Sequence, residues 1–390
     1  MIHRRPVLIS AATVAVAAIG AGGAFLAVHS GAAASASGKS GASVADVSGG
    51  TAPSVTTPPT TAAPPQLSVA ASSPAAGAKG VDGSAPLVVT TSAPVDSTAS
   101  LPQITPTVPG AWSTSGDRLT FTPTDAFAPL TTYTVTIPAG LRSTSGGTVG
   151  SSHSWTFTTE AGSVLWMQQL LARLGYLPLN WTAAAGQPAE TPGHALYHPQ
   201  TGQFAWTWSS PPATLVAAWS PGQYTAMTKG AVMAFEADHG LAVDGVAGPQ
   251  VWGALFQVAS QPSPQTNQHG YTYALAQKSS PETLTVWHDG TVLSQSPANT
   301  GIAQAPTPDG TFAVYERLKT QIMRGTNPNG TKYADPVAWV AYFNGGDAIH
   351  YIPRSSYGSP QSLGCVEVSY PVGQHIWPYL TYGSLVTVSG

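Results

Sequence analysis

The sequence predicts a modular, mostly β protein in which one small helical domain lies between two β-rich domains. Its 390 residues exceed the roughly 250 residues that a single hydrophobic core usually serves. Short runs that alternate apolar and hydroxyl residues dominate residues 67–159 and 271–390, which is the pattern of half-buried strands. A helical spacing of apolar residues appears only between these regions, from Val164 to Leu255.

The N-terminal segment has the features of an export signal. Arg4 and Arg5 precede an apolar stretch over residues 7–28, so we assign residues 1–29 to a signal peptide or membrane anchor. The stretch is long enough for either fate, and both stay open. Residues 30–66 are mainly Ala, Ser, Thr, Pro and Gly, which predicts a disordered linker. We therefore expect an exported protein that contacts the membrane only through this segment.

The composition excludes one class of partner. Charged residues make up 8% of the chain and the formal net charge is −3. Binding to nucleic acid needs clustered Lys and Arg that neutralise phosphates, so nucleic acid is excluded as a partner. The chain holds one cysteine, Cys365, which cannot form an internal disulfide and is a candidate reactive thiol.

Residues 67–160 are predicted to form a small antiparallel β-sandwich. Each run is bounded by Pro, Gly or Ser, and the runs are 87–91, 118–122, 132–137 and 154–159. The late runs around Tyr133 and Trp155 resemble those of bacterial Ig-like envelope modules. That resemblance implies a spacer without chemistry of its own.

Residues 161–260 are predicted to hold three helices. The first ends at Gly175, the second has Thr228 as its cap and stops at Gly240, and the third starts at Pro249. Residues 240–245 read Gly-Leu-Ala-Val-Asp-Gly, and the segment resembles the three-helix peptidoglycan-binding domain. An insert at 178–225 departs from that family; its tryptophans could stack on sugars or fill a core, and both readings stay open.

Residues 271–390 again predict strands, and they carry the chemistry. A strand through 338–343 leads to His350 at a strand end, and a loop rich in Gly, Ser and Pro then leads to Cys365. A free thiol is mostly protonated at neutral pH, so nucleophilic attack needs a base, and His350 lies 15 positions upstream. Gly364 allows close substrate approach, and the backbone N–H groups of Gly364 and Cys365 are candidate oxyanion donors. Ser362 is a candidate hydroxyl donor or a turn-stabilising residue.

These residues resemble the catalytic domain of L,D-transpeptidases of the YkuD type. The resemblance rests on Ile349-His350, on residues 362–365 (Ser-Leu-Gly-Cys) and on residues 307–312 (Thr-Pro-Asp-Gly-Thr-Phe). It implies that His350 activates Cys365 and that the carbonyl of Tyr351 orients the histidine. It also implies a thioester on peptidoglycan stem peptides, 3-3 cross-links, acylation by carbapenem-type β-lactams, and chemistry without cofactor or metal.

Two positions depart from the commonest spelling of that family. Leu363 stands where a histidine is frequent, and Glu367 stands where Arg or Asn is frequent. Candidate substrate-binding residues are Glu367 and three loop residues, Arg354, Tyr357 and Gln361. The departures motivate a rival interpretation, a catalytically inactive wall-binding scaffold. Water or a protein amine as acceptor would instead give an L,D-carboxypeptidase or protein-to-wall attachment. A zinc site that joins Cys365, His350, Glu367 and His375 follows no familiar ligand spacing.

Overall fold

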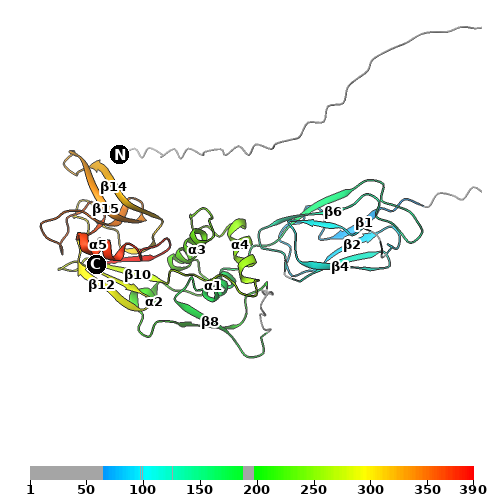
Figure 1. Ribbon diagram of the computed structural model, residues 1–390, viewed down its shortest axis with the longest axis horizontal. Helices are drawn as coiled ribbons and strands as arrows, with labels where there is room; N and C mark the ends of the chain where they lie inside the picture. Colours follow the sequence, from blue (N-terminus) through cyan, green and yellow to red (C-terminus); the bar gives the residue numbers. More distant parts are fainter. Residues whose placement is uncertain (1–64, 97, 99, 125, 188–196) are drawn as a thin grey trace, which may run out of the picture. The chain divides into compact units, whose positions relative to one another are not determined.

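Strands predominate over helices, as predicted. The computed structural model describes residues 65–390 except 97, 99, 125 and 188–196 (Figure 1). The signal or anchor expected at 1–29 and nearly all of the expected linker lie outside the described residues. Within the described ranges, no helix is both long enough and apolar enough to cross a membrane.

The first domain is a two-sheet β-sandwich. One sheet has the order β1 (Val69–Ser73), β2 (Leu87–Thr91), β5 (Arg118–Pro123), β4 (Gly110–Ser115), and the other has β3 (Gln103–Thr105), β6 (Thr132–Ile137), β7 (His153–Thr158). Alternate residues of β2 and β6 are buried, as the alternating sequence predicted. Aromatic rings, including Phe127 and Phe157 in an edge-to-face pair, fill the core.

The helical domain contains the three predicted helices, α1 (Val164–Arg173), α3 (Ala226–Asp238) and α4 (Pro249–Ala259). Gly175 and Gly240, just past α1 and α3, take positive φ angles, as the predicted helix stops require. The cap predicted at Thr228 is wrong. Helix α3 begins one turn earlier, and the Thr228 hydroxyl is buried inside the domain, where it accepts a hydrogen bond from Gln168.

A buried carboxylate holds the turn between α3 and α4. Oε2 of Glu236 accepts hydrogen bonds from the backbone N–H groups of Asp244 (3.0 Å) and Gly245 (2.8 Å). Burial, opposed by these hydrogen bonds, raises the Glu236 pKa to about 7. The Val243-Asp244-Gly245 segment of the family resemblance is therefore held by a hydrogen-bond acceptor from inside the domain.

The insert after α1 forms a hairpin and a short helix, β8 (Leu179–Ala183), β9 (Gly202–Trp206) and α2 (Ala213–Ala217). Its aromatic residues pack on the domain core: Trp208 is buried, and Trp181, Trp206 and Trp219 lie partly buried against the same cluster. The core interpretation of these tryptophans is thus the one that the structure supports.

The C-terminal domain is built from two sheets. The first has the order β12 (Thr291–Pro297), β11 (Thr283–His288), β10 (Thr272–Gln277), β18 (Leu385–Ser389), β13 (Gly310–Ala313). The second has β14 (Glu316–Thr326), β15 (Lys332–Asn344), β16 (Asp347–Tyr351), β17 (Val366–Val368), and a short helix, α5 (Tyr370–Ile376), follows β17. Side chains of both sheets belong to one apolar cluster, so the second sheet packs against the first through a shared hydrophobic core.

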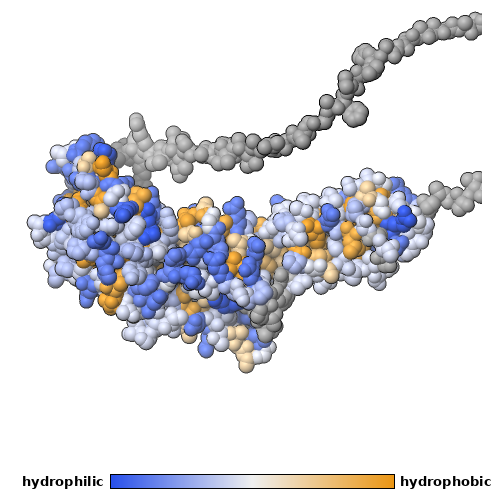
Figure 2. Space-filling model, in the orientation of Figure 1, coloured by the Kyte–Doolittle hydropathy of each residue, from blue (hydrophilic) through white to orange (hydrophobic). Residues whose placement is uncertain are grey.

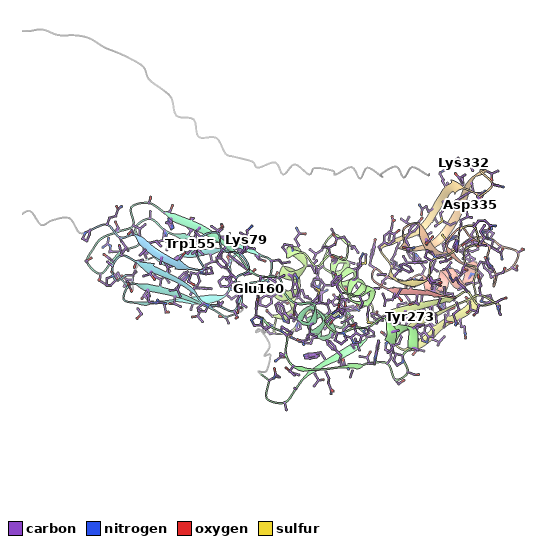
Figure 3. All side chains as sticks on the ribbon, turned by 180° about the vertical axis from the view of Figure 1, so that it is seen from behind. Lys79, Trp155, Glu160, Tyr273, Lys332 and Asp335 are labelled. Carbon is purple, nitrogen blue, oxygen red and sulfur yellow. The ribbon has the colours of Figure 1, made fainter. Side chains whose placement is uncertain are left out.

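The helical and C-terminal domains share a hydrophobic core. One apolar cluster joins Val232 and Phe235 of α3 to Tyr273 of β10 and Leu385 of β18. The Tyr273 hydroxyl donates a hydrogen bond to Thr214 Oγ1 of α2 (2.7 Å), and Figure 3 shows Tyr273 beside that helix. These contacts make the two domains one packed body.

Hydrophilic residues cover most of the surface in Figure 2, and the apolar ones form small separate patches. Large apolar side chains that are exposed include Val246 on the turn after α3 and Ile322 on β14. A chain with few charges thus keeps a polar surface through its hydroxyl and amide residues.

Candidate active site

The site is built on two neighbouring strands of the second sheet. Strands β16 and β17 pair in parallel, and His350 lies opposite Glu367. Paired residues point to the same face, and so do residues two apart in one strand. Cys365 immediately precedes β17, and its side chain lines the same cavity as that of His350. The opposite face, with Ile349 and Val366, is buried in the core.

His350 is buried and has a defined tautomer. Its Nδ1 donates a hydrogen bond to the carbonyl of Tyr351 (3.2 Å), which leaves Nε2 as the basic atom. Burial lowers the pKa of His350, and the Tyr351 carbonyl and the charge of Glu367 oppose that shift. The imidazole is therefore neutral at pH 7, the state in which it can accept a proton.

Cys365 is a neutral thiol in the resting site. Burial raises its pKa to about 12, the charges of Asp347 and Glu367 add to the shift, and the backbone N–H of Ala348 opposes it. The thiol donates to the carbonyl of Gly346, with Sγ and O 3.8 Å apart. Attack by sulfur therefore requires that the proton be removed as the bond forms.

The turn before the nucleophile is closed by Ser362. The buried Ser362 hydroxyl donates to the carbonyl of Cys365 (2.6 Å) and accepts from the N–H of Gly364 (3.1 Å). Of the two alternatives for Ser362, these hydrogen bonds support the turn-stabilising role. They also correct the prediction for Gly364, whose N–H is already bonded within the turn. Gly364 itself has φ +125°, a backbone angle that strains any residue with a Cβ, and such a Cβ would also displace the Asp347 carboxylate, so the position favours glycine.

Glu367 is neutralised by Arg354. The Arg354 Nε donates to Oε2 of Glu367 (2.8 Å) and its Nη2 donates to Oε1, a bidentate ion pair. The Glu367 side chain is 3% exposed and that of Arg354 31%. The hydrogen bonds with Glu367 raise the pKa of Arg354. The acidic residue at 367 therefore adds no net charge to the site, because the loop supplies its partner.

A buried amide, which the sequence did not single out, organises the loop between base and nucleophile. Asn299 Nδ2 donates to Oε2 of Glu367 (3.3 Å), and its Oδ1 accepts from the N–H of Gly358 (2.9 Å) and from Nε2 of Gln361 (3.2 Å). The Tyr357 hydroxyl donates to the carbonyl of Ile352 (2.7 Å) and so braces the same loop. Gln361 and Tyr357 thus make structural contacts within the loop.

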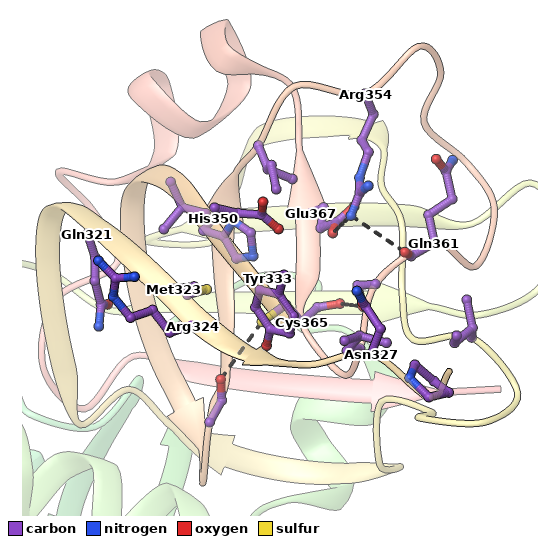
Figure 4. A pocket seen from close by; sticks show the side chains of 18 of the residues that line it. Gln321, Met323, Arg324, Asn327, Tyr333, His350, Arg354, Gln361, Cys365 and Glu367 are labelled. Carbon is purple, nitrogen blue, oxygen red and sulfur yellow. Dashed lines mark hydrogen bonds and ion pairs between the residues drawn. The ribbon is translucent and has the colours of Figure 1, made fainter. Parts of the chain in front are cut away.

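A cavity of about 840 Å³ opens over this strand face (Figure 4). Among the predicted residues, the cavity wall includes His350, Cys365, Ser362 and Glu367, together with Arg354, Gln361 and Leu363. Tyr351, Tyr357 and Gly364 are not among the described residues that line it. Tyr351 and Gly364 therefore affect the site without lining the cavity: the Tyr351 carbonyl accepts from His350, and Gly364 shapes the turn before Cys365.

The long β14–β15 hairpin supplies wall residues that the sequence gave no reason to select. They include Gln321, Met323, Arg324, Tyr333 and Asp335. Arg324 makes no ion pair with any described residue, so its guanidinium remains available to a substrate carboxylate. An alternating sequence pattern can predict the two strands of such a hairpin. Only the structure shows which of their side chains line the cavity.

The structure does not gather the residues of the zinc alternative. His375 lies on α5, where its Nε2 is 3.3 Å from the carbonyl of Leu293, and the carboxylate of Glu367 is engaged by Arg354. A compact group of metal-ligand types in the described residues is Asp82, Glu160 and His198, which excludes both Cys365 and His350.

Comparison with known families assigns each domain. Residues 61–159 match the bacterial Ig-like domain, residues 209–255 the putative peptidoglycan binding domain, and residues 271–388 the L,D-transpeptidase catalytic domain. Each match covers less than half of the chain. The residues that line the catalytic cavity all lie within the L,D-transpeptidase catalytic-domain match, as the sequence motifs predicted.

Solved structures similar to this chain include L,D-transpeptidases. An enzyme from Mycobacterium smegmatis is 16% identical (84% of this chain, 100% of that chain, TM-score 0.29). L,D-transpeptidase 3 from Mycobacterium tuberculosis is 16% identical (83% and 98%, TM-score 0.29). The catalytic domain of the E. faecium enzyme is 26% identical (30% and 96%, TM-score 0.28). No curated protein matches the chain.

Proposed function

We propose that this protein is an exported peptidoglycan L,D-transpeptidase that forms 3-3 cross-links through a thioester on Cys365. One observation carries the proposal. Cys365 and His350, a thiol and an imidazole, line one cavity in a domain that matches the L,D-transpeptidase catalytic family.

The first half-reaction uses the donor stem peptide. Nε2 of His350 takes the thiol proton while sulfur attacks the carbonyl carbon of the third stem residue, a diaminopimelate-type residue. The new C–S bond forms, the C–N bond to the terminal D-Ala breaks, and the proton on His350 passes to the leaving amine. The N–H of Cys365 is the remaining donor of the pair predicted for the oxyanion, because that of Gly364 is bonded to Ser362.

The second half-reaction transfers the acyl group. The side-chain amine of a second stem peptide attacks the thioester, the C–S bond breaks, and a proton moves from the amine through His350 to sulfur. An amide remains between two third-position residues and the free thiol is restored. If water attacks instead, the product is a shortened stem and the enzyme acts as an L,D-carboxypeptidase; a protein amine would give protein-to-wall attachment.

Charge balance in the site supports a competent enzyme over the inactive scaffold that Leu363 and Glu367 suggested. The Arg354–Glu367 pair leaves the strand face without net charge, and Nη1 of Arg354 makes none of the pair's hydrogen bonds. Arg354 and the unpaired Arg324 are therefore the candidates that bind substrate carboxylates.

Intact-mass spectrometry with a carbapenem tests the proposal. The purified full-length chain is expected to gain one covalent adduct that is absent in Cys365→Ala and forms at least about a hundredfold more slowly in His350→Ala. A donor tetrapeptide is then expected to release D-Ala and yield cross-linked dimer with an amine acceptor. If the protein is folded but forms neither the adduct nor the cross-linked product, the proposal fails and the chain is better explained as an inactive wall-binding scaffold.

A further inference from the structure

A second cavity, of about 440 Å³, lies between the helical and the catalytic domain. Ala226, Lys229 and Asp244 line one side, and Phe312, Asn344 and Gly345 line the other; we call it the domain groove. Its helical wall lies within the putative peptidoglycan-binding match and its other wall within the L,D-transpeptidase match. Both walls therefore belong to domains directed at one polymer.

The turn between β15 and β16 separates the domain groove from the catalytic cavity. Asn344 and Gly345 line the groove, whereas the next residue, Gly346, lines the catalytic cavity. The carbonyl of Gly346 accepts the hydrogen bond of the Cys365 thiol. At both glycines an added Cβ would meet no atom within 4 Å. The two glycines of this turn therefore place no side chain between the groove and the nucleophile.

The two domains that line the groove are in close contact with each other. A Cβ at Gly230 of α3 would lie 2.4 Å from the carbonyl oxygen of Gly383, so the two backbones meet directly there, beside another cavity of the same domain interface. The Tyr315 hydroxyl donates to the carbonyl of Gly345 and holds the turn on the catalytic side. The groove is therefore a built feature of the packed domains.

We propose that the domain groove binds the acceptor stem peptide, an inference that rests on the proposed transpeptidase function. Transfer needs a second substrate whose amine reaches the thioester while the donor fills the catalytic cavity. A groove that adjoins the nucleophile across a bare turn holds that amine close and so favours it over water. Its volume is in the range of peptide and small-molecule sites.

The charges of the groove suit a stem peptide. Lys229 is exposed and makes no ion pair with any described residue, so its ammonium is available to a stem carboxylate. Asp244, on the same wall, offers a carboxylate to an amine. Phe312 and Met233 supply apolar surface for alanyl methyl groups.

The test separates acylation from transfer. Full-length parent, Lys229→Glu and Ala226→Trp are each given a donor tetrapeptide and increasing amounts of an amine-bearing stem peptide, and cross-linked dimer and hydrolysed tripeptide are counted by mass spectrometry. Both variants are expected to raise the acceptor concentration for half-maximal cross-linking about tenfold and to shift product towards hydrolysis. Carbapenem acylation should not change. Lys79→Glu, the same charge change on an exposed residue of the β-sandwich, is the matched control.

Unchanged acceptor dependence in both variants would overturn the inference. So would loss of binding to intact sacculi with unchanged cross-linking of soluble peptides, because that result would assign the groove to polymer anchoring. Failure of the proposed function would look different, since the parent itself would then form no carbapenem adduct.

Discussion

The ion pair between Arg354 and Glu367 allows a quantitative test of the site. In Arg354→Gln, a carboxylate that is 3% exposed loses both hydrogen bonds of its bidentate partner. Removing one member of a buried pair costs about 3–5 kcal/mol, and the partial exposure of Arg354 reduces our expectation to about 2 kcal/mol. For a body of this size, we expect the Tm to fall by about 5 °C.

The same substitution should slow acylation through the thiol. The charge of Glu367 already raises the pKa of Cys365, and without Arg354 that charge acts unscreened on the same strand face. The thiol pKa then rises further, and we expect carbapenem acylation at pH 7 to slow by about tenfold, the effect of one pKa unit. Glu367→Gln should change the thiol pKa in the opposite direction, because it removes the negative charge. The pH profile of acylation should therefore move to lower pH.

A double-mutant cycle provides the assay. Thermal unfolding and acylation rates are measured for Arg354→Gln, Glu367→Gln and the double variant, with Arg354→Lys as the variant that keeps the charge and loses the bidentate geometry. The double variant should be more stable than Arg354→Gln, with a coupling energy of about 2 kcal/mol. Additive effects, or a pH profile that does not move in Glu367→Gln, would refute the reasoning.

Three further substitutions test other parts of the fold. Burial raises the pKa of Glu236 to about 7, so the stability that this group contributes is full below about pH 4.5 and is lost as the pH rises through 7. Glu236→Gln should therefore flatten the curve of Tm against pH between these values. An unchanged slope would contradict the raised pKa. Gly364→Ala places a Cβ at φ +125° and makes the neighbouring Asp347 carboxylate move, so carbapenem acylation should fall about a hundredfold; near-parental acylation would contradict this. Gly230→Ala should improve helix propensity by about 1 kcal/mol, yet it should lower the Tm because the added Cβ meets the backbone of Gly383. Gly253→Ala in α4 is the control. Its Cβ would meet no atom within 4 Å, so this variant should raise the Tm.

Local patterns were sufficient to predict most of the fold. The alternation in residues 132–137 appears in the structure as strand β6. Asp-Gly between two β-rich runs is typical of a hairpin turn, and Asp289 and Gly290 both have positive φ in the turn between β11 and β12. Thr228 failed as a cap because a hydroxyl near a helix start looks the same in sequence whether it faces solvent or a buried glutamine. The tryptophans of the insert were ambiguous for a similar reason, since burial is decided by the fold.

The candidate site was predictable only in its chemistry. Cys365 and His350 could be selected because nucleophile and base are recognisable residue types. The partner of Glu367 could not, because Arg354 is 13 positions away and meets it only through the parallel pairing of β16 with β17. Asn299 and Arg324 were missed because a buried amide and an arginine on a strand carry no motif of their own.

The turn after α3 and the turn after β15 have the same physical design. In each, a side chain hydrogen-bonds to the backbone of a turn beside the domain groove: the buried Glu236 accepts from Asp244 and Gly245, and the half-buried Tyr315 donates to the carbonyl of Gly345. Turns that were merely connections would not need such fixed backbone, since connecting loops tolerate variation. The hydrogen bonds of Glu236 and Tyr315 therefore hold both turns in place before any ligand enters. A preformed groove of this kind lets the second substrate bind without ordering a loop, which is what an acceptor competing with water for a thioester requires.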